Sequence, residues 1–170
     1  MGARLAVEAF IAHGHRDIAY LTQSDREDNY ADVAPQRELG YRAAMTAGGL
    51  ADHIRVLVLR QHGAPRDDQI EEILTSPNRP RAMICWSDLD AIPLLSAAHR
   101  LGIRVPQDLA VIGYDNSPVE GLSMVDLTSI DQGGPRLGKL AAEALFSRMN
   151  GRSVAEHILT EPTLIARGSL

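Results

Sequence analysis

The sequence contains a single cysteine, Cys85, which lies within an apolar run. One thiol excludes a disulfide framework and a thiolate zinc cluster, and its apolar neighbours indicate a small buried hydrophobic residue rather than a nucleophile. His13 and His15 flank Gly14 and could ligate a metal, but the end of a helix favours cationic side chains, and the remaining histidines show no ligand spacing. We therefore predict no metal site.

Basic runs and long hydrophobic stretches are also lacking. The net charge is -5, and no helix carries the stripe of Lys and Arg with which proteins neutralise nucleic-acid phosphates. No apolar stretch approaches the ~20 residues that span a bilayer. The chain opens directly into charged, helical sequence, so we expect no signal peptide. These absences favour a single-domain cytoplasmic protein of 170 residues with no nucleic-acid surface on this segment and no membrane partner.

Three glycine motifs of nucleotide and hydrolase chemistry are absent. The sequence has no G-x-G-x-x-G dinucleotide fingerprint, no G-x-x-x-x-G-K-[ST] phosphate loop and no G-x-S-x-G elbow. We therefore predict no cofactor and no catalytic residues.

Helical and strand patterns alternate along the chain. Helices are predicted over residues 2–13, 35–47, 67–75, 88–101 and 135–150, and strands over residues 17–21, 54–59, 82–86, 109–113, 127–130 and roughly 157–167. Strands separated by helices of this length form βαβ units, so the fold class is α/β, with a mainly parallel sheet flanked by helices. The chain starts with a helix, as if an earlier strand and lobe were missing, and we expect it to be a piece of a longer protein.

Polar residues follow several of the predicted strands. They are Ser87 and Asp88 after residues 82–86, Asp115 after residues 109–113, and Gln132 after residues 127–130; Arg37 lies in the first turn of a helix. The carboxyl ends of parallel strands share one edge of a sheet, so these side chains can converge on one cleft. Each has a simpler alternative, because Ser87 can cap a helix, Asp115 can form a turn and Gln132 can be a loop residue.

The combination of an arginine with an acid suits a ligand rich in hydroxyl groups. Arg37 offers a rigid fork of donors, and Asp115 accepts from vicinal hydroxyls. No base sits beside a nucleophile, so Asp115 is predicted to hold a ligand rather than to catalyse. Trp86 could stack on the apolar face of a sugar or fill the core beside the sheet. Ser87 and Asp90 have the spacing of a capping box.

The predicted helix over residues 88–101 is apolar on more than one stripe. The sheet can cover only one side, so the other is predicted to meet a second subunit, although a wholly internal helix is the alternative. The predicted dimer contacts are Ile92, Leu95, Ala98 and His99 on this helix, with Ser117 and Leu122 in the loop after the strand at residues 109–113.

The ordered set "QRELGY", "AMICWSDLDAI", "RVPQDLAVIGYDN", "LTSI-x-Q" and a terminal "ARGS" resembles the effector-binding domain of lac repressor family transcription regulators. The resemblance covers nearly the whole chain and extends, more loosely, to periplasmic sugar-binding proteins. It implies one lobe of a type I periplasmic-binding-protein-like domain, with the N-terminal lobe largely missing. Residues 1–131 would form the second lobe, residues 132–152 a helix belonging to the first lobe, and residues 153–170 a strand that returns to the second.

The resemblance also assigns roles to individual residues. Arg37 matches the arginine that grips effector hydroxyls, Asp115 the acid that pairs with sugar hydroxyls, and Gln132 the hinge glutamine. Asp88 matches the acid of an asparagine–aspartate pair, whose asparagine is Ser87 here. Gly134 stands where some members place an aromatic ring, so one stacking wall would be either missing or supplied by Trp86.

The resemblance implies a regulator, a probable repressor, that binds a sugar or related polyol between two lobes and acts as a homodimer. Operator DNA would be bound only through a missing N-terminal head. With most of one lobe absent, we expect effector binding by this chain alone to be weak or undetectable. A periplasmic solute-binding lobe, a flavodoxin-like enzyme using Asp115 or Cys85, and a module that chiefly dimerises are the alternatives.

Overall fold

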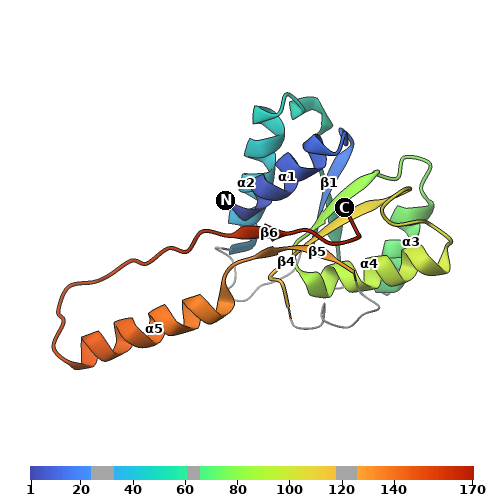
Figure 1. Cartoon of the computed structure of the whole chain (residues 1–170). Helices are drawn as coiled ribbons and strands as arrows, with labels where there is room; N and C mark the ends of the chain where they lie inside the picture. The colour runs from blue at the N-terminus through green and yellow to red at the C-terminus, as the bar shows by residue number, and fades with distance from the viewer. Residues whose placement is uncertain (24–32, 61–65, 118–125) are drawn as a thin grey trace.

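Figure 1 shows a computed structural model of the chain, which describes residues 1–23, 33–60, 66–117 and 126–170. The helices are α1 (Gly2–Ala12), α2 (Val33–Ala47), α3 (Arg66–Thr75), α4 (Asp88–Arg100) and α5 (Gly134–Met149), with a short 3-10 helix η1 (Ala51–His53). The strands are β1 (Ile18–Gln23), β2 (Arg55–Leu59), β3 (Ala82–Cys85), β4 (Ala110–Tyr114), β5 (Thr128–Asp131) and β6 (Thr163–Ile165).

The strands form one sheet in the order β2-β1-β3-β4-β5-β6. The first five are parallel to one another, and β6 pairs with β5 in the antiparallel direction. This confirms the predicted α/β class with a mainly parallel sheet. Because Leu21 is in register with Cys85 and Tyr114 with Ile130, the carboxyl ends of β1, β3, β4 and β5 lie at one edge.

Helices cover both faces of the sheet (Figure 1). On one face, Phe10 of α1 and Tyr41 and Met45 of α2 pack on strand residues that include Tyr20 and Ile112. On the other face, α3 and α4 pack on the alternate strand residues, with Ile70, Leu74 and Leu94 against Leu21 and Met83. The four inner strands β1, β3, β4 and β5 are therefore buried on both sides, which explains why β1, β3 and β4 are largely apolar, whereas the outer strands β2 and β6 are only partly covered.

The predicted helix end at Gly14 is present. Gly14 has a φ of 87°, in the left-handed region that glycine adopts without steric cost, and the N–H of His15 donates to the Phe10 carbonyl at 2.9 Å. This turn redirects the chain from α1 into β1.

Helix α5 and the segment that returns from it project from the rest of the molecule (Figure 1). We call residues 134–162 the arm. No residue of α5 is buried, and Leu145, Phe146 and Met149 are exposed. Within the arm, Arg152 joins the returning segment to α5, because its guanidinium donates to the Ala144 carbonyl at 3.0 Å.

The last strand is shorter than predicted, since β6 spans Thr163–Ile165 and not residues 157–167. The register explains the difference: Asp131, the final residue of β5, pairs with Thr163, so earlier residues would lie beyond the end of β5. None of the helices in the described ranges is long and apolar enough to cross a membrane.

Candidate functional site

Arg37 is at the centre of a polar group at the carboxyl edge of the sheet. Its guanidinium lies 3.8 Å from the ring centroid of Tyr114 and 5.0 Å from that of Trp86. One terminal nitrogen donates to the Trp86 carbonyl at 2.6 Å, and the other donates to Asp115 Oδ1 at 3.0 Å. Aromatic rings and a carbonyl therefore fix the guanidinium plane while it reaches the acid at the end of β4.

Asp115 receives a second donor from the loop after β5. Gln132 Nε2 donates to the same oxygen, Oδ1, at 2.6 Å. Burial raises the pKa of Asp115, and the neighbouring Arg37 opposes that rise. In the described part of the chain no donor occupies Asp115 Oδ2, and its side chain is 34% exposed. We call Arg37, Asp115 and Gln132 the polar triad. It brings together a residue of α2 and the residues that directly follow β4 and β5, and it leaves one carboxylate oxygen able to accept a hydroxyl.

The Trp86 ring lies in the core and not at the surface, where a ring that stacks on a ligand would be expected. Its side chain is largely buried and belongs to the core under α1 and α2, with the guanidinium of Arg37 over its ring. Of the two roles left open by the sequence, the structure shows the core-filling one. Its contribution to the site is a carbonyl and a ring for Arg37.

Ser87 and Asp88 do not join the polar triad. Both side chains are buried, because the start of α4 turns them toward the interior. Ser87 Oγ donates to Asp90 Oδ2 at 2.7 Å and makes no cap hydrogen bond, so the expected capping box is not formed. Asp88 is 0% exposed and bonds to Ser129 and Ser117. The carboxylate of Asp88 is therefore enclosed by protein, which corrects the expectation that it faces a ligand.

A second buried carboxylate, Asp90, was not singled out as a site residue from the sequence. It accepts from Gln23 Nε2 at the end of β1, from Ser87, and from a guanidinium nitrogen of Arg66 at the start of α3. From the sequence, the position of Asp90 three residues after Ser87 predicted a capping role. No signal in the sequence indicates that Asp90 pairs with Arg66, which is distant along the chain. The described ranges contain no group of three or more His, Cys, Asp or Glu side chains that could hold a metal ion.

The predicted dimer residues on α4 fall into two sets. Ala98 is fully buried in the core between α4 and the sheet, so it cannot contact a partner; its apolar stripe faces the sheet. Ile92, Leu95 and His99 line a surface cavity of ≈ 880 Å³, with Ile92 and Leu95 half-buried and His99 exposed. Leu122 lies outside the described residues. Ser117 is half-buried, and its N–H donates to Asp88.

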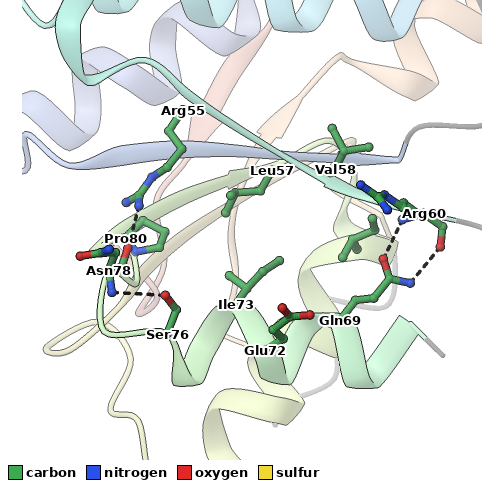
Figure 2. Close-up of a pocket in the computed structure, with 11 residues that line it drawn as sticks. Arg55, Leu57, Val58, Arg60, Gln69, Glu72, Ile73, Ser76, Asn78 and Pro80 are labelled. Carbon is green, nitrogen blue, oxygen red and sulfur yellow. Dashed lines mark hydrogen bonds between the residues drawn. The ribbon is translucent and has the colours of Figure 1, made fainter. Parts of the chain in front are cut away.

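A further cavity of ≈ 520 Å³ lies between the outer strand β2 and α3, away from the polar triad (Figure 2). Its floor includes Leu57 and Ile73. Gln69 closes one end, because its amide donates to the Arg60 carbonyl at 2.9 Å and accepts from the Arg60 N–H at 2.8 Å (Figure 2). A side-chain amide thus takes the place of a neighbouring strand at this sheet edge.

The fold is that of one lobe of a two-lobed α/β domain, and residues 7–170 match the family model of the periplasmic binding protein-like domain. The chain belongs to this family, in the form that the domain takes in lac repressor-type transcriptional regulators.

Two curated relatives and one solved structure illustrate the similarity. The chain is 34% identical to the HTH-type transcriptional repressor PurR of Erwinia tasmaniensis, over 99% of this chain and 49% of that protein. It is 32% identical to the ribose operon repressor of Haemophilus influenzae, over 100% of this chain and 51% of that protein. A regulatory protein of the LacI family from Chloroflexus aggregans superposes with a TM-score of 0.78 at 34% identity, covering 99% of this chain and 60% of that chain.

The chain spans about half the length of the curated relatives it matches. Those relatives are transcriptional repressors, which agrees with the expectation of a regulator and not an enzyme. Cys85, one of the two candidate residues of the enzyme alternative, is fully buried in β3, and burial raises the pKa of its thiol. A buried thiol with a raised pKa is a poor nucleophile at neutral pH.

Proposed function

We propose that this chain is the ligand-sensing portion of a cytoplasmic transcriptional repressor and that its polar triad binds a small hydroxyl-rich effector, most simply a sugar. The observation that carries the proposal is the meeting of Arg37, Asp115 and Gln132 at the carboxyl edge of the sheet. Ligands of open parallel sheets bind at this edge. The ribose operon repressor among the relatives makes ribose the first compound to test.

The triad recognises hydroxyl groups through paired donors and acceptors. Asp115 Oδ2 accepts from one hydroxyl, while Arg37 keeps N–H groups beyond those given to Trp86 and Asp115. A polyol can donate to Asp115 Oδ2 and accept from the Arg37 N–H groups, whereas an apolar ligand would leave this acceptor and these donors without partners.

The second half of the cleft would come from a first lobe outside this chain. In this proposal residues 132–152, which include α5, pack on that lobe, and residues 153–170 return to the second lobe. The exposed apolar side chains of the arm support this assignment. An effector that touches both lobes would favour one lobe orientation, and a dimeric DNA-binding head outside this chain would respond to it. The net charge of -5 is consistent with DNA contacts lying elsewhere.

A thermal-shift screen of this chain against sugars, sugar phosphates and nucleosides tests the proposal. A compound at ten times its Kd stabilises the fold by about 1.4 kcal/mol, a shift of a few degrees for a chain of this size. Stabilisation by a sugar that is lost in Asp115→Ala supports the proposal. Equal stabilisation of both proteins would place the ligand elsewhere and contradict it, and a compound that binds tightly without the first lobe would contradict the two-lobe arrangement.

We propose that homodimerisation uses the outer face of α4, through Ile92, Leu95 and His99. The half-buried aliphatic side chains beside a surface cavity support this choice. Sedimentation equilibrium of Leu95→Glu should show a monomer. Leu145→Glu, which changes an exposed residue of the arm, is the matched control and should remain a dimer. Dissociation of the control alone would show that the arm, and not α4, carries the association.

A further inference from the structure

The carboxylate of Asp88 is fully enclosed, yet both of its oxygens bond to groups that surround Asp115. Oδ2 accepts the backbone N–H of Ser117 at 2.8 Å, and Oδ1 accepts the hydroxyl of Ser129 at 2.7 Å. Ser117 lies two residues after Asp115, and Ser129 lies in the neighbouring strand β5. A carboxylate supplies acceptors only, so it satisfies two donors that an amide of the same shape could not both satisfy.

Gly113 in β4 provides the space that this carboxylate occupies. A Cβ at position 113 would collide with Asp88 Oδ1. Glycine weakens a strand interior and often marks a close approach by another group, and here that group is the Asp88 side chain. The glycine lies two residues before Asp115, so the carboxylate enters the sheet directly beside the turn that carries the triad acid.

That turn has an unfavourable backbone conformation. Asp115 has a φ of 106° and Asn116 a φ of 49°, and both are non-glycine residues in the left-handed half of the Ramachandran plot. Such a backbone conformation is unfavourable for a residue with a side chain and persists only where its surroundings hold it.

Three successive backbone N–H groups hold the turn. Asp115 donates to the Ile130 carbonyl at 2.9 Å, Asn116 donates to Ser129 Oγ at 3.1 Å, and Ser117 donates to Asp88. Because Ser129 accepts from Asn116 and donates to Asp88, the Asp88–Ser129 pair controls two of these three bonds. The side chain of Asn116 adds bonds to Asp131 and Arg167.

We infer that Asp88 is a positioning residue: with Ser129 it holds the strained turn so that the Asp115 carboxylate meets Arg37 and Gln132. The inference rests on the proposed function only in taking Asp115 as an effector residue. It gives Asp88 a role without ligand contact and explains why an acid lies fully buried at the start of α4, three residues after β3 ends.

The test compares Asp88→Asn and Ser129→Ala with the unchanged chain by NMR, without any effector. We expect the Asn116 and Ser117 amides to exchange with solvent about tenfold faster in both variants, because a buried partner is lost. In Ser129→Ala we also expect the measured pKa of the Asp115 carboxyl to move down toward its ordinary value, because the carboxyl leaves its buried position. In Asp88→Asn the loss of the neighbouring negative charge lowers that pKa in any case, so amide exchange is the readout for that variant. If Asp88→Asn does not fold, Ser129→Ala carries the test.

Tyr41→Phe is the control. It removes a buried hydroxyl that donates to the Ile18 carbonyl at 2.8 Å, on the sheet face under α2 but at the opposite end of β1. It should lower global stability while the pKa of Asp115 stays unchanged. Unchanged exchange at Asn116 and Ser117 in both test variants, with an unchanged Asp115 pKa in Ser129→Ala, would overturn the inference. The NMR test uses no effector, so its outcome does not depend on the effector screen. The positioning role of Asp88 and the effector-binding proposal can therefore be refuted independently of each other.

Discussion

At the residue scale, the surroundings of Asp115 disfavour the charged form of its carboxyl group. Its pKa is raised from the ordinary 3.8, chiefly by burial, even though Arg37 attracts the carboxylate. The folded state therefore binds a proton at this site more tightly than the unfolded state does. Stability contributed by the protonated form is lost as pH rises from 3.8 through the folded pKa. An acid kept under these conditions is consistent with a role in binding.

The variant Asp115→Asn should accordingly be more stable than the unchanged chain at neutral pH. The amide oxygen can still accept from Arg37 and Gln132, and the cost of a half-buried charge is removed. The advantage should disappear at pH values below 3.8, where the native carboxyl is protonated in both states. Thermal unfolding across this pH range measures the difference. Asp52→Asn, at an exposed position in η1, is the control, and a pH-independent loss of stability in Asp115→Asn would contradict the account.

The sequence was sufficient to predict the polar triad but not the role of its neighbours. Arg37, Asp115 and Gln132 could be predicted to meet because two follow parallel strands and the third, the fifth residue of α2, lies near the start of the adjoining helix. Asp88 shares that pattern, and only the space left by Gly113 shows that its carboxylate turns inward. Local sequence could not show that Asp90 pairs with Arg66, because the two residues meet through the packing of α3 against α4.

At the element scale, β4 is the strand that connects the core to the site. It runs between β3 and β5, its residues are buried, and it ends at Tyr114, whose ring lies under Arg37. The carboxyl end of β4 needs a glycine at position 113, because the Asp88 carboxylate occupies the space that a Cβ would fill. Two residues later, Asp115 begins the turn that follows the strand.

Gly113→Ala should therefore destabilise the fold by about 1–3 kcal/mol, the usual cost of overpacking. Chemical denaturation measures the loss. The matched control is Gly138→Ala in α5, where a Cβ would meet no neighbouring atom within 4 Å. In a helix interior this change should stabilise by up to about 1 kcal/mol. Equal tolerance of both substitutions would show that Asp88 does not occupy the space beside β4.

The element pattern also shows where prediction from sequence stops. The bounds of α1 and α5 follow from glycine and proline signals near their ends, and the structure confirms them within a residue or two. The length of β6 depends on where β5 ends, which the apolar pattern of residues 157–167 does not reveal.

At the scale of the whole molecule, the chain divides into a packed α/β body and the arm. The body buries aromatic and aliphatic side chains on both faces of the sheet, and the arm buries none within α5. Phe10 is 0% exposed and Phe146 is 62% exposed, so two phenylalanines in one chain have opposite environments.

Phe10→Ala should cost about 3–5 kcal/mol in unfolding free energy, as is usual for a buried phenylalanine. Phe146→Ala should change it by less than about 0.5 kcal/mol, as is usual for a surface position. Denaturant unfolding of the two variants makes the comparison. A large loss of unfolding free energy in Phe146→Ala would show that Phe146 is covered in solution, either by a second copy of the chain or by the α/β body.

The most direct test of the effector site is an NMR titration of the chain with the sugar that stabilises it most, mapped onto the backbone amides. The account predicts shifts at Arg37, at Tyr114 to Ser117 and at Gln132, and their loss in Asp115→Ala. Shifts confined to the cavity of Arg60, Gln69 and Ile73, with the polar triad unmoved, would contradict it.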